Sequence, residues 1–221
     1  MNESFVKINT SFVSERINKV RFIEEEQANF EPSSFISGSS ENKNNVKLWK
    51  LLRNDFADEN ENDLIPKAMS KLTIDGEVTG IEVLDYNNVA VSAGSSVSLI
   101  YINRDQERNN LRVNHHFGDI HKFKKTGDAA LCTGISAFNE NISTIGEDGR
   151  INVISANNQK IITTIEDADS VTQTAIRFIN YKELITGNRL GVMNTFDIRS
   201  GSKKPTATFA VSCEDEKKSN A

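Results

Sequence analysis

The chain has 221 residues, of which 37% are hydrophobic and 26% are charged, a composition typical of a soluble globular protein with a packed core. The net charge of −5 argues against a nucleic-acid-binding surface, which requires a basic field. No apolar run approaches the roughly 18 residues of a membrane span. The first ten residues, MNESFVKINT, do not form a secretory signal, and Cys132 and Cys213 are isolated, so we expect a cytosolic or nuclear protein.

The N-terminal third of the chain predicts strands and polar connections. After an N-terminal segment at 1–13, residues 14–23 (SERINKVRFI) form the first predicted strand, which either opens the first repeat unit or completes the last. Residues 34–52 give the first clear hairpin. Residues 53–71 are rich in Asp, Glu and Asn and contain Pro66, so we expect a long exposed loop there.

The rest of the chain continues in the same way. Residues 103–127 read as a long polar insertion, and residues 201–221 read as a polar tail or the start of a further unit. No segment has the helical period, and the short apolar runs are rich in Val, Ile, Thr and Phe, which favour strands. We therefore expect four repeat units, at residues 14–52, 72–102, 130–165 and 170–199.

A recurring hairpin pattern is the most informative feature of the sequence. Residues 142–154 read ISTIGEDGRINVI, in which Asp148 and Gly149 separate two strand-like runs. An Asp-Gly pair in this setting predicts a tight hairpin, because Gly accepts the positive φ that the turn requires. The same pattern of strand, polar turn and strand recurs in SFISGSSENKNNVKLW at 34–49, NVAVSAGSSVSLI at 88–100 and ELITGNRLGVMNTF at 183–196.

The spacing of these hairpins predicts the fold class. If Trp49, Ile100, Ile154 and Phe196 are equivalent positions, the steps between them are 51, 54 and 42 residues. Blades of WD-type β-propellers span about 40–45 residues and carry a Trp-Asp pair near the end of their third strand. Here the pair is degraded to a Trp without Asp or to Phe196-Asp197. We expect an all-β, WD40-type β-propeller, and another all-β sandwich of evenly spaced hairpins is the alternative.

The candidate residues for chemistry have structural interpretations. His115, His116 and His121, with Asp119 between them, fit no strong metal-ligand spacing, so we expect a solvent-exposed polar loop. We expect the basic run at 122–125 (KFKK) to be solvated loop charge.

The same holds for the remaining candidates. We expect Cys132 to be a small buried strand residue, and Asp148 to form its turn by bonding its own backbone rather than to act with Glu147 as a catalytic pair. Phosphate-binding, dinucleotide-binding and nucleophile-elbow motifs are absent from the sequence. We therefore assign no catalytic, cofactor-binding or metal-binding residue and expect a protein that is not an enzyme.

Several motifs carry a family resemblance. The most specific is GEDGRIN at 146–152. It is supported by Thr164-Ile165, Ala168-Asp169-Ser170, ELIT at 183–186, FDIR at 196–199, FVS at 12–14 and Trp49. On these residues the chain resembles the small WD40 nucleoporins, peripheral subunits of the Y-shaped scaffold complex of the nuclear pore. The match runs with gaps from about residue 12 to 213 and is poor at 103–127.

The resemblance implies a seven-bladed propeller, of which this chain supplies about four blades, so we expect part of a longer ring. It also implies a non-catalytic scaffold at the nuclear pore and, in mitosis, at the kinetochore. The implied partners are other nucleoporins of the Y complex, above all a helical short-arm subunit, with no direct nucleic-acid contact and no membrane insertion. The implied processes are pore assembly, mRNA export and protein transport. The resemblance assigns no docking residue.

Two other functions remain open from the sequence. One is a different WD40 adaptor, such as a ubiquitin-ligase substrate receptor or a chromatin-associated scaffold, which shares the fold and differs in partner. The other is a propeller hydrolase or lyase, which requires carboxylates or histidines at the central channel. Two predicted inner strands, Ile135–Phe138 and Ile176–Ile179, carry only Ser136 and Arg177 as polar groups, which disfavours catalysis.

Overall fold

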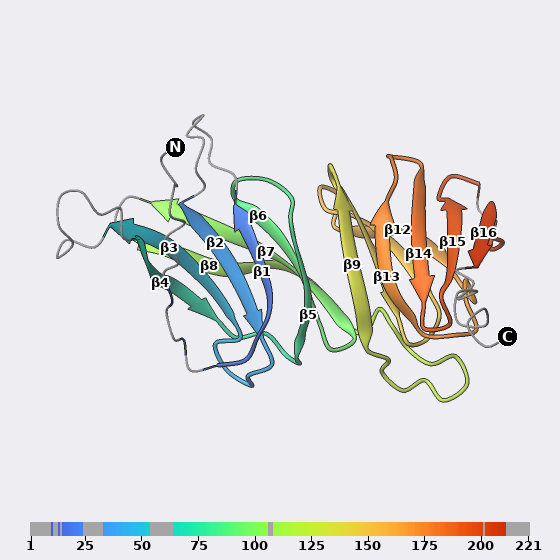
Figure 1. Cartoon of the computed structure of the whole chain (residues 1–221), viewed down its shortest axis with the longest axis horizontal. Helices are drawn as coiled ribbons and strands as arrows, with labels where there is room; N and C mark the ends of the chain where they lie inside the picture. Colours follow the sequence, from blue (N-terminus) through green and yellow to red (C-terminus); the bar gives the residue numbers. More distant parts are fainter. Residues whose placement is uncertain are drawn as a thin grey trace, which may run out of the picture.

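The computed structural model describes residues 10, 13, 15–23, 33–53, 64–105, 108–200 and 202–210. All sixteen regular elements in these ranges are β-strands, and they form four antiparallel sheets of four strands each. Each sheet is a meander whose strand order follows the chain, as in a propeller blade (Figure 1). The all-β class expected from the strand-rich composition is confirmed.

Blades 1 and 2 come from the N-terminal half of the chain. Blade 1 contains β1 (Ile17–Ile23), β2 (Ser34–Ser39), β3 (Val46–Arg53) and β4 (Leu64–Leu72). Blade 2 contains β5 (Val78–Val83), β6 (Asn88–Ala93), β7 (Ser96–Asp105) and β8 (Arg108–Phe117).

Blades 3 and 4 follow in the C-terminal half. Blade 3 contains β9 (Cys132–Phe138), β10 (Asn141–Gly146), β11 (Ile151–Ser155) and β12 (Lys160–Ile165). Blade 4 contains β13 (Gln173–Phe178), β14 (Glu183–Asn188), β15 (Val192–Asp197) and β16 (Ala207–Ala210). Within the described ranges there is no helix that is long and apolar enough to span a membrane.

The first strand of each blade lies on the inside of the arc. Strand β1 packs against β5, β5 packs against β9, and β9 packs against β13. The blades therefore follow one another around a common axis, with blade 1 and blade 4 at opposite ends of the arc (Figure 1). The first predicted strand thus opens the first blade.

Three hydrophobic cores hold the four blades together, one at each junction. Ile36, Val78 and Ile81 belong to the core between blades 1 and 2. The core between blades 2 and 3 includes Ile135, and the core between blades 3 and 4 includes Phe178. Because a blade is a single sheet, it can bury apolar side chains on both faces, which is why strands such as β11 are buried along their whole length.

The register of the strands confirms that the four predicted positions are equivalent. Trp49, Ile100, Ile154 and Phe196 lie on the third strand of their blades, and each is buried. Each one pairs with the second residue of the second strand, in the pairs Phe35↔Trp49, Val89↔Ile100, Ile142↔Ile154 and Leu184↔Phe196. The repeat is therefore preserved in geometry where the Trp-Asp motif has been lost.

Two predicted loops contain strands, and these predictions are corrected. Within 53–71, strand β4 begins at Leu64 and includes Pro66, while residues 54–63 lie outside the described residues. Within 103–127, β7 continues to Asp105 and β8 follows at Arg108–Phe117. Both β4 and β8 are outermost strands with many exposed side chains, and polar residues interrupt their apolar ones, so neither has the pattern of a buried strand. An edge strand also tolerates Pro, because one of its sides needs no backbone N–H donor.

The segment predicted as a polar tail also contains a strand. Strand β16 completes blade 4 by pairing with β15, with Met193 opposite Phe209 and Thr195 opposite Ala207. Four residues give too short a run for a sequence pattern to indicate a strand. The expected end of the tail, 211–221, and the expected N-terminal segment 1–13, apart from residues 10 and 13, lie outside the described residues.

The predicted Asp-Gly turn forms as expected. Gly149 adopts a φ of 72°, the positive value that joins β10 to β11. A side chain at this position would meet the backbone, because a Cβ built on Gly149 lies 2.1 Å from the carbonyl oxygen of Asp169. Gly149 therefore serves two purposes, the hairpin turn in blade 3 and the close approach of the segment that leads into blade 4.

Candidate functional site

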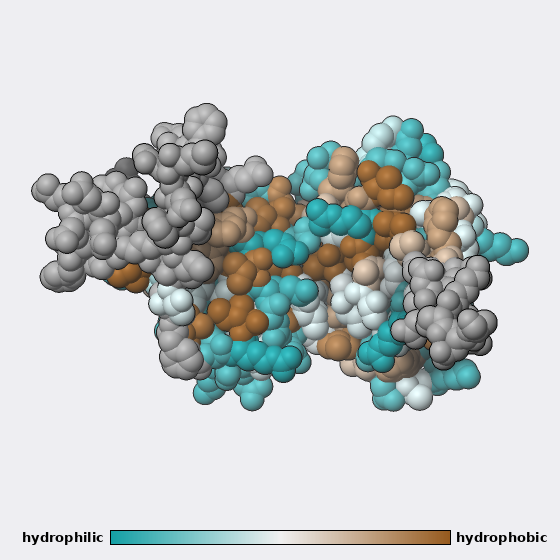
Figure 2. Space-filling model, in the orientation of Figure 1, coloured by the Kyte–Doolittle hydropathy of each residue, from teal (hydrophilic) through white to brown (hydrophobic). Residues whose placement is uncertain are grey.

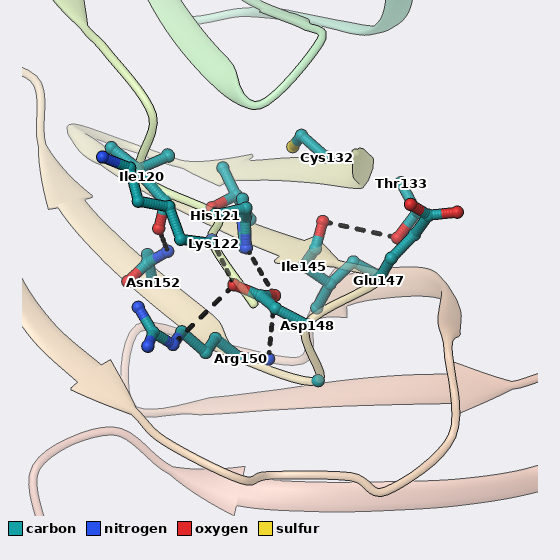
Figure 3. A network of polar contacts seen from close by, with 12 residues as sticks. Ile120, His121, Lys122, Cys132, Thr133, Ile145, Glu147, Asp148, Arg150 and Asn152 are labelled. Carbon is teal, nitrogen blue, oxygen red and sulfur yellow. Dashed lines mark hydrogen bonds and ion pairs between the residues drawn. The ribbon is translucent and has the colours of Figure 1, made fainter. Parts of the chain in front are cut away.

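A buried polar network centred on His121 joins blades 2 and 3 (Figure 3). His121 lies in the connection between β8 and β9 and is fully buried. Its Nδ1 lies 2.9 Å from Asp148 Oδ1, and its Nε2 lies 2.9 Å from Thr144 Oγ1. The imidazole thus ties the connection between the blades to the central hairpin of blade 3. The predicted solvent-exposed loop is wrong for His121, because both ring nitrogens have partners inside the protein.

The Asp148 carboxylate is held by groups from two segments. It accepts hydrogen bonds from the backbone N–H groups of Lys122 at 2.9 Å and Arg150 at 3.2 Å, in addition to its contact with His121. Burial by itself would raise the pKa of Asp148, but the interactions with His121 and the two backbone donors outweigh it and hold this pKa below its ordinary value. The bond from Arg150 N confirms the predicted turn-forming role, and the contact with His121 was not predicted.

The contacts of Thr144, His121 and Asp148 follow the order of a nucleophile, a base and an orienting acid. A triad of this kind needs a nucleophile that substrate can reach. All three side chains are buried, and none of them lines the two larger hollows described below. The network therefore has the geometry of a structural tie.

Blade 4 replaces this network with a different one. Thr186 and Leu190 stand where blade 3 has Thr144 and Asp148, and Leu190 is 72% exposed. The carboxylate comes instead from Asp169, in the connection before the blade, whose Oδ2 accepts a 2.9 Å hydrogen bond from Asn188 Nδ2. A hydrogen bond between the connection and the hairpin is therefore present in both blades. In blade 3 the hairpin supplies the carboxylate, and in blade 4 the connection supplies it.

The other two histidines do not belong to this network. His115 and His116 are on strand β8, where Ser98 Oγ lies 3.0 Å from His116 Nδ1. Among the residues that the structure describes, no group of three or more His, Cys, Asp or Glu side chains is arranged to hold a metal ion.

Cys132 and Ser136 are structural residues of the inner strand β9. Cys132 is fully buried, as predicted, and burial raises the pKa of its thiol to about 12, which leaves it protonated and unreactive at neutral pH. Ser136 is also buried, and its Oγ accepts a hydrogen bond from Phe178 N at 3.2 Å. It therefore ties β9 to β13 and does not face the channel.

The channel beside the inner strands contains a charged cluster that the sequence analysis did not find. Glu82 of β5 lies 3.4 Å from Arg21 Nη2 of β1 and 3.7 Å from Arg177 Nη1 of β13. Glu82 is the only carboxylate on the four inner strands as the structure describes them. Paired hydrolytic chemistry needs a second carboxylate or a histidine opposite it. Identifying β1 and β5 as inner strands would have placed Arg21 and Glu82 beside the channel with the already predicted Arg177, but only the packing of the strands brings the three together.

Two hollows open on the surface of the described residues. A hollow of about 430 Å³ lies between blades 2 and 3 and is lined mainly by amide side chains, with carboxylates at Asp85 and Glu140. Such a lining suits hydrogen bonds to a polypeptide backbone. A second hollow, of about 390 Å³, lies on blade 1 and is apolar, with Phe35, Trp49 and Leu51 among its walls. On the face drawn in Figure 2, apolar side chains also form a band over the inner strands.

Comparison with known proteins gives two sequence relatives. Nucleoporin Nup43 of Homo sapiens is 26% identical over 216 aligned residues, which cover 93% of this chain and 56% of the human protein. Nucleoporin Nup43 of Mus musculus is 27% identical over the same shares of the two chains. The chain therefore spans about half the length of the curated relatives it matches. No protein-family model matches it.

Solved structures support the fold. The WD40 β-propeller domain of Doa1 superposes with a TM-score of 0.56 at 16% identity, over 82% of this chain and 52% of that one. The β-propeller domain of Cps50 (Swd1) from Myceliophteria thermophila superposes with a TM-score of 0.55 at 16% identity, over 82% and 53% of the two chains. The chain is thus a WD40-type β-propeller whose sequence is similar to that of nucleoporin Nup43 along nearly all of its length.

Proposed function

We propose that this protein is a non-catalytic scaffold subunit of the outer-ring Y complex of the nuclear pore. The observation that carries the proposal is the similarity to nucleoporin Nup43, which extends over 93% of the chain and so includes the blades as well as their connections. The proposed location is the nuclear pore, and the kinetochore in mitosis. In this role the protein supports pore assembly, mRNA export and protein transport by holding other nucleoporins.

The physical character of the described surface supports a binding role over a catalytic one. The only chain of nucleophile, base and acid, at Thr144, His121 and Asp148 among the described residues, is buried and serves to tie a hairpin. The channel carboxylate Glu82 is engaged by two arginines. The hollows offer amide and apolar walls, which suit contact with another polypeptide. The proposed partner is a helical short-arm subunit of the Y complex, with no direct contact to nucleic acid and no membrane insertion.

Fluorescent tagging in cells of the source organism tests the location. The proposal predicts a continuous signal at the nuclear rim. The Gly149→Ala variant, in which a Cβ would collide with the Asp169 backbone, should lose the rim signal because the junction of blades 3 and 4 cannot form. The Gly127→Ala variant is the matched control, because nothing lies within 4 Å of its Cβ, and it should keep the rim signal. Diffuse signal from the unmodified protein would contradict the proposal.

Affinity capture identifies the partner class. The proposal predicts that scaffold nucleoporins co-purify with the tagged protein in stoichiometric amounts. Capture of a ubiquitin ligase or of histone-associated subunits, without nucleoporins, would select the other WD40 adaptor function and reject this one.

A further inference from the structure

The hollow between blades 2 and 3, which we call the amide hollow, has one wall from each blade. Asp85 lies in the β5–β6 turn of blade 2, and Glu140 lies in the β9–β10 turn of blade 3. Leu99, a buried member of the core between these blades, also lines it, so the hollow ends on that core. Its volume of about 430 Å³ lies within the range of about 300–1,000 Å³ that ligand sites occupy. All of its lining residues belong to these two blades, so its shape depends on neither end of the arc.

Three amide side chains of this lining have hydrogen-bonding groups to spare. Asn114 of β8, Asn139 of the β9–β10 turn and Gln159 of the β11–β12 turn form no side-chain hydrogen bond with any residue that the structure describes. Each amide offers a carbonyl oxygen and two N–H donors. An extended polypeptide complements such groups, because its own backbone N–H and C=O groups are unpaired. The backbone groups of a helix are already paired with one another, so a helix does not complement them.

The amide hollow also carries negative charge that no cation of the described residues neutralises. Asp85 Oδ1 accepts hydrogen bonds from the backbone N–H groups of Asn87 at 2.8 Å and Asn88 at 2.9 Å, and Glu140 Oε2 accepts one from Asn157 Nδ2. These bonds hold both carboxylates to their turns. No Lys or Arg lines the hollow, and neither carboxylate forms an ion pair within the described part of the chain. The complement of this charge is a cationic side chain.

We infer that the amide hollow binds an extended segment of a partner polypeptide that carries an arginine or lysine side chain. The backbone of the segment exchanges hydrogen bonds with Asn114, Asn139 and Gln159, and its cationic side chain is directed to Asp85 and Glu140. The two carboxylates come from different blades, so the bound segment bridges blades 2 and 3. The inference rests on the proposed binding role and adds the chemistry of the segment that is bound.

NMR titration of the unmodified protein with a short basic peptide tests the inference. The probe is acetyl-Gly-Gly-Arg-Gly-Gly amide, which should shift the backbone amide signals of the lining residues and saturate with a Kd of about 1 mM, since the contact is small. The same peptide with Gln in place of Arg should bind about tenfold more weakly, because it lacks the charge-assisted hydrogen bonds. The peptide with Glu in place of Arg should not saturate the protein. Equal binding of the three peptides would overturn the inference.

Two further probes separate recognition of a polypeptide from attraction of a cation. N-methylation of the Gly residues on either side of Arg removes two N–H donors and keeps the charge, so it should weaken binding about tenfold. Arginine amide, which lacks the flanking backbone, should bind at least as weakly as the methylated peptide. If arginine amide binds as tightly as the full peptide, the hollow attracts only a cation and the inference is wrong.

Variants of the protein locate the binding site. Asp85→Asn and Glu140→Gln each remove a charge and keep an oxygen that can accept the hydrogen bonds of the turn, so the combined variant should fold, which thermal unfolding checks. It should bind the Arg peptide about tenfold more weakly. Glu41→Gln, an exposed position in the β2–β3 turn of blade 1, is the matched control and should leave the Kd unchanged.

The outcomes that overturn the inference differ from those that reject the proposed function. Unchanged binding in the combined variant, or the absence of saturation by the Arg peptide, would show that the amide hollow is not a peptide site. Neither result alters the nuclear-rim signal of the tagged protein, which tests the proposed function by itself. The two failures are therefore distinguishable.

Discussion

Asp148 performs two tasks in blade 3. It closes the β10–β11 turn through Arg150 N, and it holds the buried imidazole of His121. A substitution that changes the charge or the shape of this side chain should destabilise the protein, because the carboxylate oxygens have fixed partners and the surroundings exclude water. Single substitutions in this network should therefore lower the stability of the fold more than substitutions of polar surface residues do.

The pH dependence of unfolding should report the Asp148 carboxylate. Its pKa is lower in the folded protein than the ordinary value of 3.8, so the stabilisation is complete above that value and is lost as the pH falls through the lower, folded pKa. Asp148→Asn should lower the free energy of unfolding at pH 7 by about 2 kcal/mol. Urea titrations should show that the difference in free energy of unfolding between the unmodified protein and Asp148→Asn shrinks below about pH 4. A difference that stays constant down to pH 2 would contradict this assignment.

Gly149 and Gly127 form a matched pair for testing backbone constraint. Their φ angles are 72° and 75°, so Ala at either position has the same intrinsic cost, about 1–2 kcal/mol. Only at Gly149 does the new Cβ meet backbone, at 2.1 Å from Asp169 O. Chemical denaturation should show that Gly149→Ala is destabilised by at least about 2 kcal/mol more than Gly127→Ala. Equal losses would show that the approach of Asp169 does not constrain the turn.

At the scale of the element, the two central strands of each blade are more buried than its outermost strand. The strand β4 and the strand β8 carry the exposed side chains, whereas β10 and β11 are buried almost throughout. Central hairpins therefore have strong apolar patterns and edge strands do not. The connections before blades 3 and 4 add a polar tie to each central hairpin.

The tie in blade 4 predicts a local effect. Asp169 accepts hydrogen bonds from Asn188 Nδ2 and from Val171 N, both at 2.9 Å. Asp169→Ala should destabilise the protein by about 1–2 kcal/mol and speed amide exchange at the β14–β15 turn, because the Asn188 side chain loses its acceptor. Asp128, in the connection before blade 3, is exposed and lies outside this network, so Asp128→Ala is the control and should leave both quantities unchanged. Identical behaviour of the two variants would disprove the tie.

At the scale of the whole molecule, the four blades differ in how much of their surface is covered. Among the residues that the structure describes, blades 2 and 3 pack against a neighbouring blade on both faces, and blades 1 and 4 do so on one face. Burial of apolar area is the main source of stability, at about 25 cal/mol per Å². The middle of the arc should therefore be more stable than its ends.

Hydrogen exchange checks this gradient. Amides of β6 and β10 should exchange more slowly than those of β2 and β14, the matching strands of blades 1 and 4. Uniform protection across all four blades would contradict the gradient.

The sequence by itself determined the strand class, the repeat and the central hairpins. These depend on local chemistry, namely the alternation of apolar residues and the positive φ that Gly149 accepts, and local chemistry is visible in the order of residues. It also determined the equivalence of Trp49, Ile100, Ile154 and Phe196, which the register confirms, and the burial of Cys132.

Only the tertiary structure decided which polar segments are strands and which polar residues are buried. Strands β4 and β8 form because a buried neighbour supplies backbone partners on one side, whatever their own composition. His121, Glu82 and Arg177 acquire their partners from segments that are distant in the sequence, across β5, β10 and β13. The physical reason is that hydrogen bonds and ion pairs between blades depend on how the sheets pack. Local patterns in a single sequence do not indicate which distant segments will pack together.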